Sequence, residues 1–380
     1  MTRICSRGIW DSSVPGITFD ENGVSNYAKM FDKLVSSHPR GETGLKLWNK
    51  YLSIMKIDGK RKRYDCIIGV SGGTDSSYLL YLSRFYKLRA LAVTIDNGWS
   101  SDIAVKNLKN ITNKLNIDLE TLVIDYEEVK IALRAYMKAG IPWIDSPTDM
   151  AIKAGLYKIA HRESINYILN GGDFRSEGKQ PIEWTYSDAR QLKLFVKKFE
   201  NYSLISFPVF TLFDIVNYGF IKQIKQIRPY HFLEYKKNDA QKFLKSEFNW
   251  EYYGGHHYEN IFTRFVIAYW LPKKFNIDKR IISLSAQVLS GEITRSEALT
   301  IIKQPPYDPG QMERDKEFVL KKLGLTNEEF SKIWNQPNMY YYDYQSYIPI
   351  LKLIMSFAHP ISKRIFFFKP TFFTEQEYRK

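Results

Sequence analysis

A short glycine-bearing stretch constrains this chain more than any other feature of its sequence. Residues 70–77 read Val-Ser-Gly-Gly-Thr-Asp-Ser-Ser and follow an apolar run at 64–70 that predicts a buried strand. The segment at 78–86 carries leucines and predicts a helix. A strand, a glycine loop and a helix in this order direct backbone N–H groups toward an anion. The stretch lacks the Gly-Lys-Ser/Thr ending of a Walker loop, so it predicts a different kind of phosphate-binding loop.

The chain after this loop alternates between strand and helix patterns. We expect strands at 88–95, 119–124 and 166–169, and helices at 101–115, 127–139 and 148–164. Such alternation is typical of βαβ units, so the predicted fold class is α/β with a parallel sheet and right-handed crossovers. Ligands bind beyond the carboxyl ends of strands in such sheets. The 70–77 loop, Asp96 and Gly171-Gly172-Asp173 all lie there and predict one shared site.

We expect three segments along the chain. Residues 1–60 form an N-terminal arm with a basic helix from about 31, residues 61–250 form the α/β domain, and residues 251–380 form a mainly helical region. The later helices are expected at 187–200, 211–227, 238–246, 261–303, 310–324 and 326–335. The apolar tail at 347–371 predicts a helix packed in the core or on a partner, with a membrane surface as the alternative.

Charge and cysteine content limit the partners and the compartment. The 380 residues carry a net charge of +14, which favours anionic partners such as nucleotides, sugar nucleotides, nucleic acid or a membrane surface without choosing among them. Two cysteines make no disulfide framework, which fits a reducing cytosol and predicts a cytoplasmic protein. No run of 18 apolar residues is present, so we expect no transmembrane segment.

The 70–77 loop resembles the Ser-Gly-Gly-x-Asp-Ser loop of the PP-loop ATP pyrophosphatases, also called adenine nucleotide alpha hydrolase-like proteins. The resemblance implies that ATP is cleaved between its α- and β-phosphates and that the acceptor is left as an adenylate. The expected ATP-binding residues are Ser71, Gly72, Gly73, Thr74, Asp75, Ser76, Ser77, Asp96, Gly171 and Gly172. Magnesium prefers oxygen ligands, so we place it on Asp75 and Asp173. The alternative for each aspartate is a helix cap or a turn.

A dense polar and aromatic cluster lies at 252–260. His256, His257 and Glu259 are candidates for hydrogen bonding to a polar acceptor or for proton transfer during nucleophilic attack. Adjacent histidines point apart on a strand or a helix, so we do not expect the pair to share a metal ion. A purely structural histidine pair stays open as the alternative.

Several stretches together resemble the N-acetyl sugar amidotransferase family of bacterial O-antigen, lipopolysaccharide and flagellin-sugar biosynthesis. They are Trp10-Asp11, residues 15–23, the 70–77 loop, Asp96-Asn97-Gly98-Trp99, residues 255–260, Thr263-Arg264-Phe265, Lys274-Phe275 and Asp278-Lys279-Arg280. The resemblance implies that ATP activates the acetamido group of a nucleotide-linked sugar (a UDP-sugar) as an adenylylated imidate. Ammonia then attacks, and an acetamidino group and AMP result.

The residues indicate the rest of the site, and the same resemblance implies partners. From the residues themselves we expect catalytic roles for Asp75, His256, His257 and Glu259, and substrate binding by Asn260, Arg264, Lys274 and Arg280, with a solvated basic face as the alternative for Lys274 and Arg280. The expected partners are a glutaminase subunit and a cyclase-like subunit, similar to those of histidine biosynthesis, which supply ammonia. No nucleic acid is expected, but a PP-loop enzyme acting on tRNA and a non-catalytic nucleotide-binding scaffold for a glutaminase remain as alternatives.

The sequence departs from the family at a zinc-knuckle spacing in the arm. The four positions with this spacing read Cys5, Gly8, Ser25 and Ala28. Structural zinc normally needs four ligands, so one remaining thiol predicts that zinc is absent. We expect packing to hold the arm in place of the metal.

Overall fold

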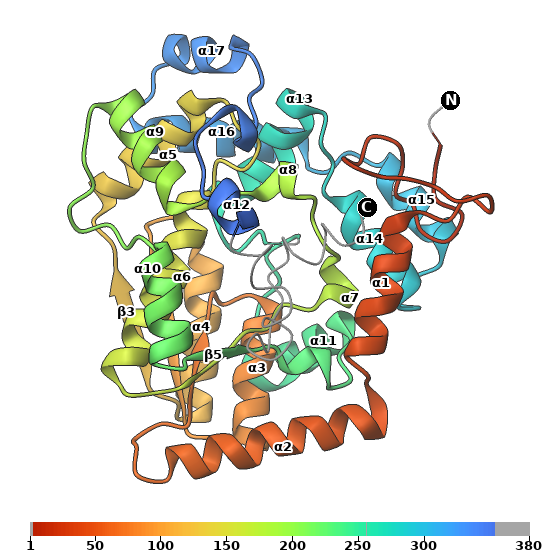
Figure 1. The fold of residues 1–380 in the computed structure, drawn as a ribbon, viewed down its shortest axis with the longest axis vertical. Coiled ribbons are helices and arrows are strands. Elements are labelled where there is room, and N and C mark those ends of the chain that lie inside the picture. Colours follow the sequence, from red (N-terminus) through yellow and green to blue (C-terminus); the bar gives the residue numbers. More distant parts are fainter. Residues whose placement is uncertain (1–2, 256, 354–380) are drawn as a thin grey trace.

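A five-stranded parallel sheet forms the centre of the protein, in a computed structural model that describes residues 3–255 and 257–353 (Figure 1). Its strands are β1 (Cys66–Gly69), β2 (Ala90–Asp96), β3 (Leu119–Val123), β4 (Tyr167–Leu169) and β5 (Lys225–Ile227). They lie in the order β3-β2-β1-β4-β5, and every neighbouring pair is parallel. The expected α/β class with a parallel sheet is confirmed.

Helices cover both faces of this sheet. Alternate residues of β1 belong to different clusters: Cys66 and Ile68 pack in one, Ile67 in the other. The helices around this sheet are α2 (Gly41–Gly59), α3 (Thr74–Phe85), α4 (Asp102–Leu115), α5 (Tyr126–Ala139), α6 (Ser146–Arg162), α7 (Phe174–Glu177), α8 (Ile182–Thr185), α9 (Ala189–Glu200) and α11 (Lys237–Phe248). Burial of both faces is typical of parallel sheets and explains the continuous apolar runs in the sequence.

The fifth strand corrects the helix expected at 211–227. That segment forms α10 (Leu212–Asp214), the π-helical η1 (Ile215–Ile221) and then β5. The backbone N–H of Lys225 donates to the Asn166 carbonyl at 2.7 Å, and the N–H of Asn170 donates to the Ile227 carbonyl at 2.9 Å. The strand forms because the backbone groups at the edge of β4 need hydrogen-bond partners. The sequence did not predict it because three residues are too few to show the alternation of a strand.

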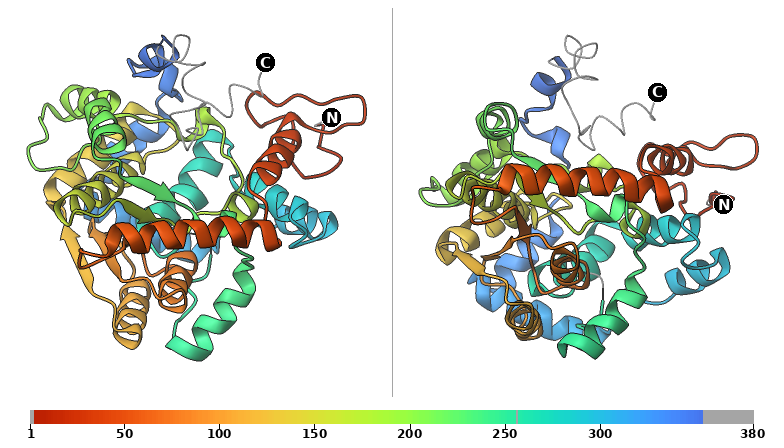
Figure 2. Two further views of the ribbon diagram at one scale, coloured as in Figure 1. Left: turned by 60° about the horizontal axis from the view of Figure 1, so that its bottom comes forward. Right: turned by 90° about the horizontal axis from the view of Figure 1, so that it is seen from below.

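Helices after residue 255 pack together with the α/β part. They are α12 (Ile261–Phe265), the π-helical η3 (Val266–Trp270), α13 (Leu271–Phe275), α14 (Arg280–Leu289), α15 (Arg295–Lys303), α16 (Pro309–Leu323) and α17 (Asn327–Asn335). Short 3₁₀ turns lie at η2 (Pro229–His231) and η4 (Tyr341–Asp343). The largest hydrophobic cluster includes Trp10, Ile67 and Phe262, one from each of the three predicted segments. Figure 1 places α2 at one end of the molecule and α17 at the other, and Figure 2 (right) views the α2 end directly.

The ends of the chain bear on two further expectations. Helix α1 (Asn26–Ser37) begins earlier than predicted, because the Ser25 side chain caps it by accepting the N–H of Ala28 at 3.2 Å. Residues 348–353 are helical, and the rest of the apolar tail lies outside the described residues. Among the described helices, none has the length and apolar character needed to cross a membrane.

The N-terminal arm folds into a knuckle around Cys5. Antiparallel bridges join Ile4 to Asp11 and Phe19 to Ser25, and the Sγ atom of Cys5 accepts the N–H of Ser25 at 3.3 Å. A Cβ atom at Gly8 would lie 2.6 Å from the ring of Trp10, which is itself buried. The Trp10 ring therefore packs directly against the Gly8 position.

Gly8→Ala is expected to lower the free energy of unfolding by about 1–3 kcal/mol, because the added methyl group overlaps the Trp10 ring. Urea unfolding measures the change. Gly219→Ala is the matched control, because nothing lies within 4 Å of its added Cβ. A chelator should leave the melting temperature of the wild type unchanged, and a drop on chelation would refute a metal-free arm.

Candidate functional site

The 70–77 loop connects β1 to α3 in a conformation that requires glycine. Gly72 has φ of +78°, and its carbonyl accepts the indole N–H of Trp250 at 3.1 Å. A Cβ atom at Gly72 would lie 2.1 Å from the carbonyl oxygen of Ala104. The loop is thus held between α4 and the segment after α11, and only a residue without a side chain fits this position.

The N-terminus of α3 lacks a side-chain cap from its own N-cap residue, Gly73. The N–H of Thr74 donates to the Tyr253 hydroxyl at 3.1 Å, and the N–H of Gly73 donates to Ser71 Oγ at 3.3 Å. Ser77 Oγ is buried and has no hydrogen-bond partner among the described residues. This helix start fits the phosphates of a nucleotide, because backbone N–H groups and the helix dipole favour an anion there.

Asp75 is held by cationic and phenolic groups from the α11 region. Its carboxylate lies 2.9 Å from Lys237 Nζ and also accepts the Tyr235 hydroxyl. Burial acts to lower the pKa of Lys237, but the charge of Asp75 outweighs it and raises that pKa above its usual range. Gly171 allows close approach, since its Cβ would lie 3.0 Å from the Asp75 carbonyl. The predicted ATP loops at 70–77 and 170–173 are therefore in contact.

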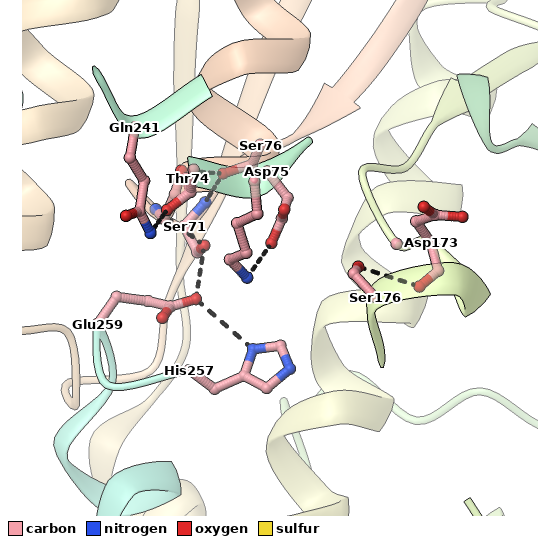
Figure 3. Close-up of polar contacts among 12 residues, drawn as sticks. Ser71, Thr74, Asp75, Ser76, Asp173, Ser176, Gln241, His257 and Glu259 are labelled. Atoms are coloured by element: carbon pink, nitrogen blue, oxygen red, sulfur yellow. Dashed lines mark hydrogen bonds and ion pairs between the residues drawn. The ribbon is translucent and has the colours of Figure 1, made fainter. Parts of the chain in front are cut away.

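Asp173 lies at the start of α7, where the Ser176 hydroxyl donates to its backbone carbonyl (Figure 3). Its carboxylate is buried and lies 2.7 Å from a guanidinium nitrogen of Arg40. Burial raises the pKa of Asp173, and Arg40 only partly opposes this. Among residues 3–255 and 257–353, no group of three or more His, Cys, Asp or Glu side chains could hold a metal ion. Asp75 is paired with Lys237 and Asp173 with Arg40, so magnesium would have to displace a cation from either carboxylate.

Asp96 lies at the end of β2, as predicted. Its carboxylate accepts the N–H of Gly98 at 2.9 Å, so it forms the turn that leads to the buried Trp99. This contact is the turn-forming role left open from the sequence. The expected role beside adenosine stays a prediction.

Glu259 joins the C-terminal region to the 70–77 loop. Ser71 Oγ donates to Glu259 Oε1 at 3.1 Å, and His257 Nδ1 lies 3.8 Å from the same oxygen (Figure 3). Glu259 Oε2 is buried without a hydrogen-bond partner among the described residues. The predicted pair of His257 and Glu259 thus lies directly beside the phosphate loop. His256, the other predicted histidine, lies outside the described residues.

Charge pairing shifts both pKa values at this contact. Burial acts to lower the pKa of His257, but the nearby charge of Glu259 raises it above the ordinary 6.5. Burial acts to raise the pKa of Glu259, but His257 brings it below 4.5. The ion pair of His257 and Glu259 therefore contributes its full stabilisation of the fold between pH 4.5 and pH 6.5. Its contribution falls as pH rises through the folded pKa of His257 and as pH drops through that of Glu259.

Glu259→Gln is expected to lower the melting temperature by about 2 °C at pH 6 and by less at pH 9, because the pairing weakens as pH rises through the folded pKa of His257. Thermal unfolding at the two pH values measures this difference. Glu251→Gln is the control, because Glu251 is exposed and pairs with Lys106 instead. An equal loss at both pH values would contradict the charge pairing.

A cavity of about 820 Å³ adjoins His257 and is named the acceptor cavity. Two predicted substrate residues line it, each with its charge paired. Arg264 binds both carboxylate oxygens of Asp315 at 2.6 Å, and Arg280 lies 2.7 Å from Asp278. Further lining residues that the sequence did not single out include Glu177, Gln180, Tyr307 and Arg314. They come from segments far apart in the chain and carry no local motif.

The two other predicted substrate residues have structural contacts. Lys274 Nζ donates to the carbonyls of Trp334 and Gln336 at 2.6 and 2.9 Å, so it caps the end of α17. Asn260 accepts the N–H of Thr263 at 3.0 Å and caps α12. Neither residue lines the acceptor cavity. We therefore leave both out of the site proposed below.

Comparison with known families concerns the segment that begins at Glu259. Residues 259–357 match the family described as LPS biosynthesis protein WbpG-like, C-terminal domain. This segment is therefore similar to the C-terminal domain of WbpG-like proteins. The family resemblance drawn from the motifs is thereby confirmed. The matched segment includes Glu259, which contacts Ser71 of the 70–77 loop. It also includes Arg264 and Arg280, which line the acceptor cavity.

Other similarities are more distant. The uncharacterized protein MJ1599 of Methanocaldococcus jannaschii is 37% identical over 68 residues, which cover 18% of this chain and 24% of that protein. An NH3-dependent NAD synthetase from Campylobacter jejuni is 13% identical, covers 82% of this chain and 98% of its own, and has a TM-score of 0.31. The U34-tRNA thiolase NcsA from Methanococcus maripaludis is 14% identical over 77% of this chain and 90% of its own, with a TM-score of 0.32.

Proposed function

We propose that this protein is an ATP-dependent amidotransferase that converts the acetamido group of a nucleotide-linked sugar to an acetamidino group. The contact between Ser71 and Glu259 carries the proposal, because it joins an ATP-type phosphate loop to a WbpG-like domain. The description of that domain family supports a role in lipopolysaccharide biosynthesis. The acceptor cavity opens beside this contact and has room for a sugar.

ATP cleavage at the α-phosphate needs an anion cradle for the departing pyrophosphate and positive charge around it. The first turn of α3 offers the cradle, and Lys237 adds a positive charge beside Asp75. Magnesium, when bound at Asp75, would neutralise phosphate oxygens. In this arrangement the chain stabilises the departing pyrophosphate without forming a covalent bond to it.

An amide oxygen is a poor leaving group, whereas AMP is a good one. Adenylylation of the acetamido oxygen therefore prepares the carbonyl carbon for attack by ammonia. His257 and Glu259 lie between the loop and the cavity, so they are placed to orient the amide and to hold its proton. Arg264 and Arg280 shape the far wall of the cavity, each fixed by its own aspartate.

Ammonia requires a source, and this proposal includes one. We propose that a glutaminase subunit and a cyclase-like subunit, resembling those of histidine biosynthesis, associate with this chain and supply it. The resemblance of the motifs supports this pairing. Co-purification with such a glutaminase tests it, and no association in either direction would contradict it.

Incubation with ATP, magnesium, ammonium and a set of acetamido UDP-sugars tests the function. We expect AMP, pyrophosphate and an amidino product whose mass is that of the substrate with one oxygen replaced by NH. Formation of AMP and pyrophosphate with tRNA, but with none of the sugars, would favour a tRNA-modifying enzyme. No turnover together with tight glutaminase binding would favour a scaffold.

A further inference from the structure

Two smaller cavities share wall residues in series with the acceptor cavity. A middle cavity of about 310 Å³ shares the wall residues Glu177, Gly178, Gln180 and Lys279 with the acceptor cavity. An outer cavity of about 280 Å³ shares Asp149 and Thr185 with the middle cavity. The three spaces therefore adjoin in series, and Asp149 and Lys279 stand at the two junctions.

Lys279 is the cation at the inner junction. Its Nζ atom lies 3.7 Å from the ring centroid of Trp143, in a cation–π contact. Burial lowers the pKa of Lys279 to about 8, and the carboxylates of Asp149, Glu177 and Asp145 only partly oppose this. In a minority of molecules Lys279 is therefore a neutral amine at neutral pH, and a neutral amine accepts a proton.

Carboxylates and an unpartnered polar atom surround the same junction. Asp149 is exposed at this junction and accepts the indole N–H of Trp143 at 2.7 Å, and burial raises the pKa of Glu177. Gln180 Oε1 belongs to a residue lining the middle cavity, is buried and lacks a hydrogen-bond partner among the described residues. A buried acceptor without a partner is costly, so this oxygen indicates a small guest that donates a hydrogen bond.

The position of Lys279 shows which guest the middle cavity suits. Its ammonium group lies on the Trp143 ring and is attracted by carboxylates, as an ammonium ion would be. The cavity is too small for a nucleotide or a sugar nucleotide. The lining carries the cations Lys179, Arg228 and Lys279 as well as the acids Asp149, Asp173 and Glu177, so charge alone does not select the guest. The small volume and the unpartnered Gln180 oxygen favour a small hydrogen-bond donor such as ammonium.

Resting on the proposed function, we propose that the middle cavity is the ammonia inlet of the acceptor site. Ammonium enters past Asp149, is held by the carboxylates of Asp149 and Glu177, and gives one proton to the neutral amine of Lys279. The ammonia that remains moves into the acceptor cavity. Its lone pair forms the C–N bond at the imidate carbon while the C–O bond to AMP breaks and its electrons leave with AMP. All three ammonia hydrogens stay on the amidinium product, and Lys279 returns its proton to water by way of Asp149.

Two variants and two half-reactions test this inlet. Lys279→Met removes the proton acceptor, and Asp149→Asn removes the charge at the outer junction. Lys273→Met is the matched control, because Lys273 is exposed nearby and lines none of these cavities. The adenylylation half-reaction is measured as the sugar-dependent exchange of pyrophosphate into ATP. Amination is followed by mass spectrometry of the product with ammonium chloride or with hydroxylamine, which is uncharged at neutral pH.

In Lys279→Met we expect the ratio of ammonium-dependent amination to exchange to fall about tenfold or more at neutral pH. The loss should shrink at higher pH, where free ammonia is more abundant, and hydroxylamine should restore the ratio. In Asp149→Asn the apparent KM for ammonium should rise, and Lys273→Met should match the wild type.

Three results would overturn the inlet. Unchanged ammonium dependence in both variants, with normal exchange, would refute it and leave the proposed function standing. An equal loss with hydroxylamine and ammonium would show that Lys279 does not handle the proton. Absence of exchange in the wild type with every acetamido sugar would refute the proposed function and the inlet together.

Discussion

Asp75→Asn is expected to slow the formation of AMP and pyrophosphate by about 1000-fold or more, because it removes the proposed magnesium ligand and the charge that positions Lys237. The free energy of unfolding should fall by about 1–3 kcal/mol, since the ammonium group of Lys237 loses its carboxylate. Pyrophosphate release and urea unfolding measure the two effects.

Asp102→Asn is the matched control for this variant. Asp102 also lies in the first turn of a helix that follows a strand, but its side chain is exposed and lines none of the three cavities. It should change activity less than about twofold and stability by about 0.5 kcal/mol or less. Near-normal turnover in Asp75→Asn would remove the metal role assigned to this carboxylate.

Gly72→Ala should abolish nucleotide binding and destabilise the fold by about 2–4 kcal/mol. Two independent effects add. The φ of +78° strains any residue with a Cβ atom, and that atom would lie 2.1 Å from the Ala104 carbonyl oxygen. The loop must move to relieve this overlap, so the backbone N–H groups no longer converge on a phosphate. Calorimetric titration with ATP and urea unfolding follow both losses.

Gly324→Ala separates the two effects. Gly324 has a similar φ of +66°, but nothing lies within 4 Å of an added Cβ. It should cost only about 1 kcal/mol and leave ATP binding intact. If Gly72→Ala binds ATP as the wild type does, the loop does not act as a phosphate cradle.

Local patterns predicted the sheet better than they predicted the contacts. The strands β1 to β4 follow apolar runs bounded by turn residues, and these signals lie within a few positions of each other. β5 was missed because its three residues, with Ile227 buried, are defined by pairing with β4. No local period describes such a strand.

In the candidate site, too, local motifs could be predicted from the sequence and long-range contacts could not. The 70–77 loop could be predicted, since its glycines and hydroxyls are consecutive. Lys237 lies 162 positions from its partner Asp75, and Glu259 lies 188 positions from Ser71, so their contacts appear only in the fold. Lys274 was predicted to bind substrate from a motif, yet its ammonium group caps a helix. A motif identified this residue but could not state its role.

The transfer of oxygen from the sugar to AMP is the central claim. It is tested most directly with an acetamido UDP-sugar carrying oxygen-18 in its amide carbonyl, incubated with ATP, magnesium and ammonium. The account predicts that the label appears in the phosphate group of AMP as the amidino product forms, because the amide oxygen leaves on the adenylyl group. An amidino product accompanied by unlabelled AMP, or by ADP and labelled phosphate, would contradict it.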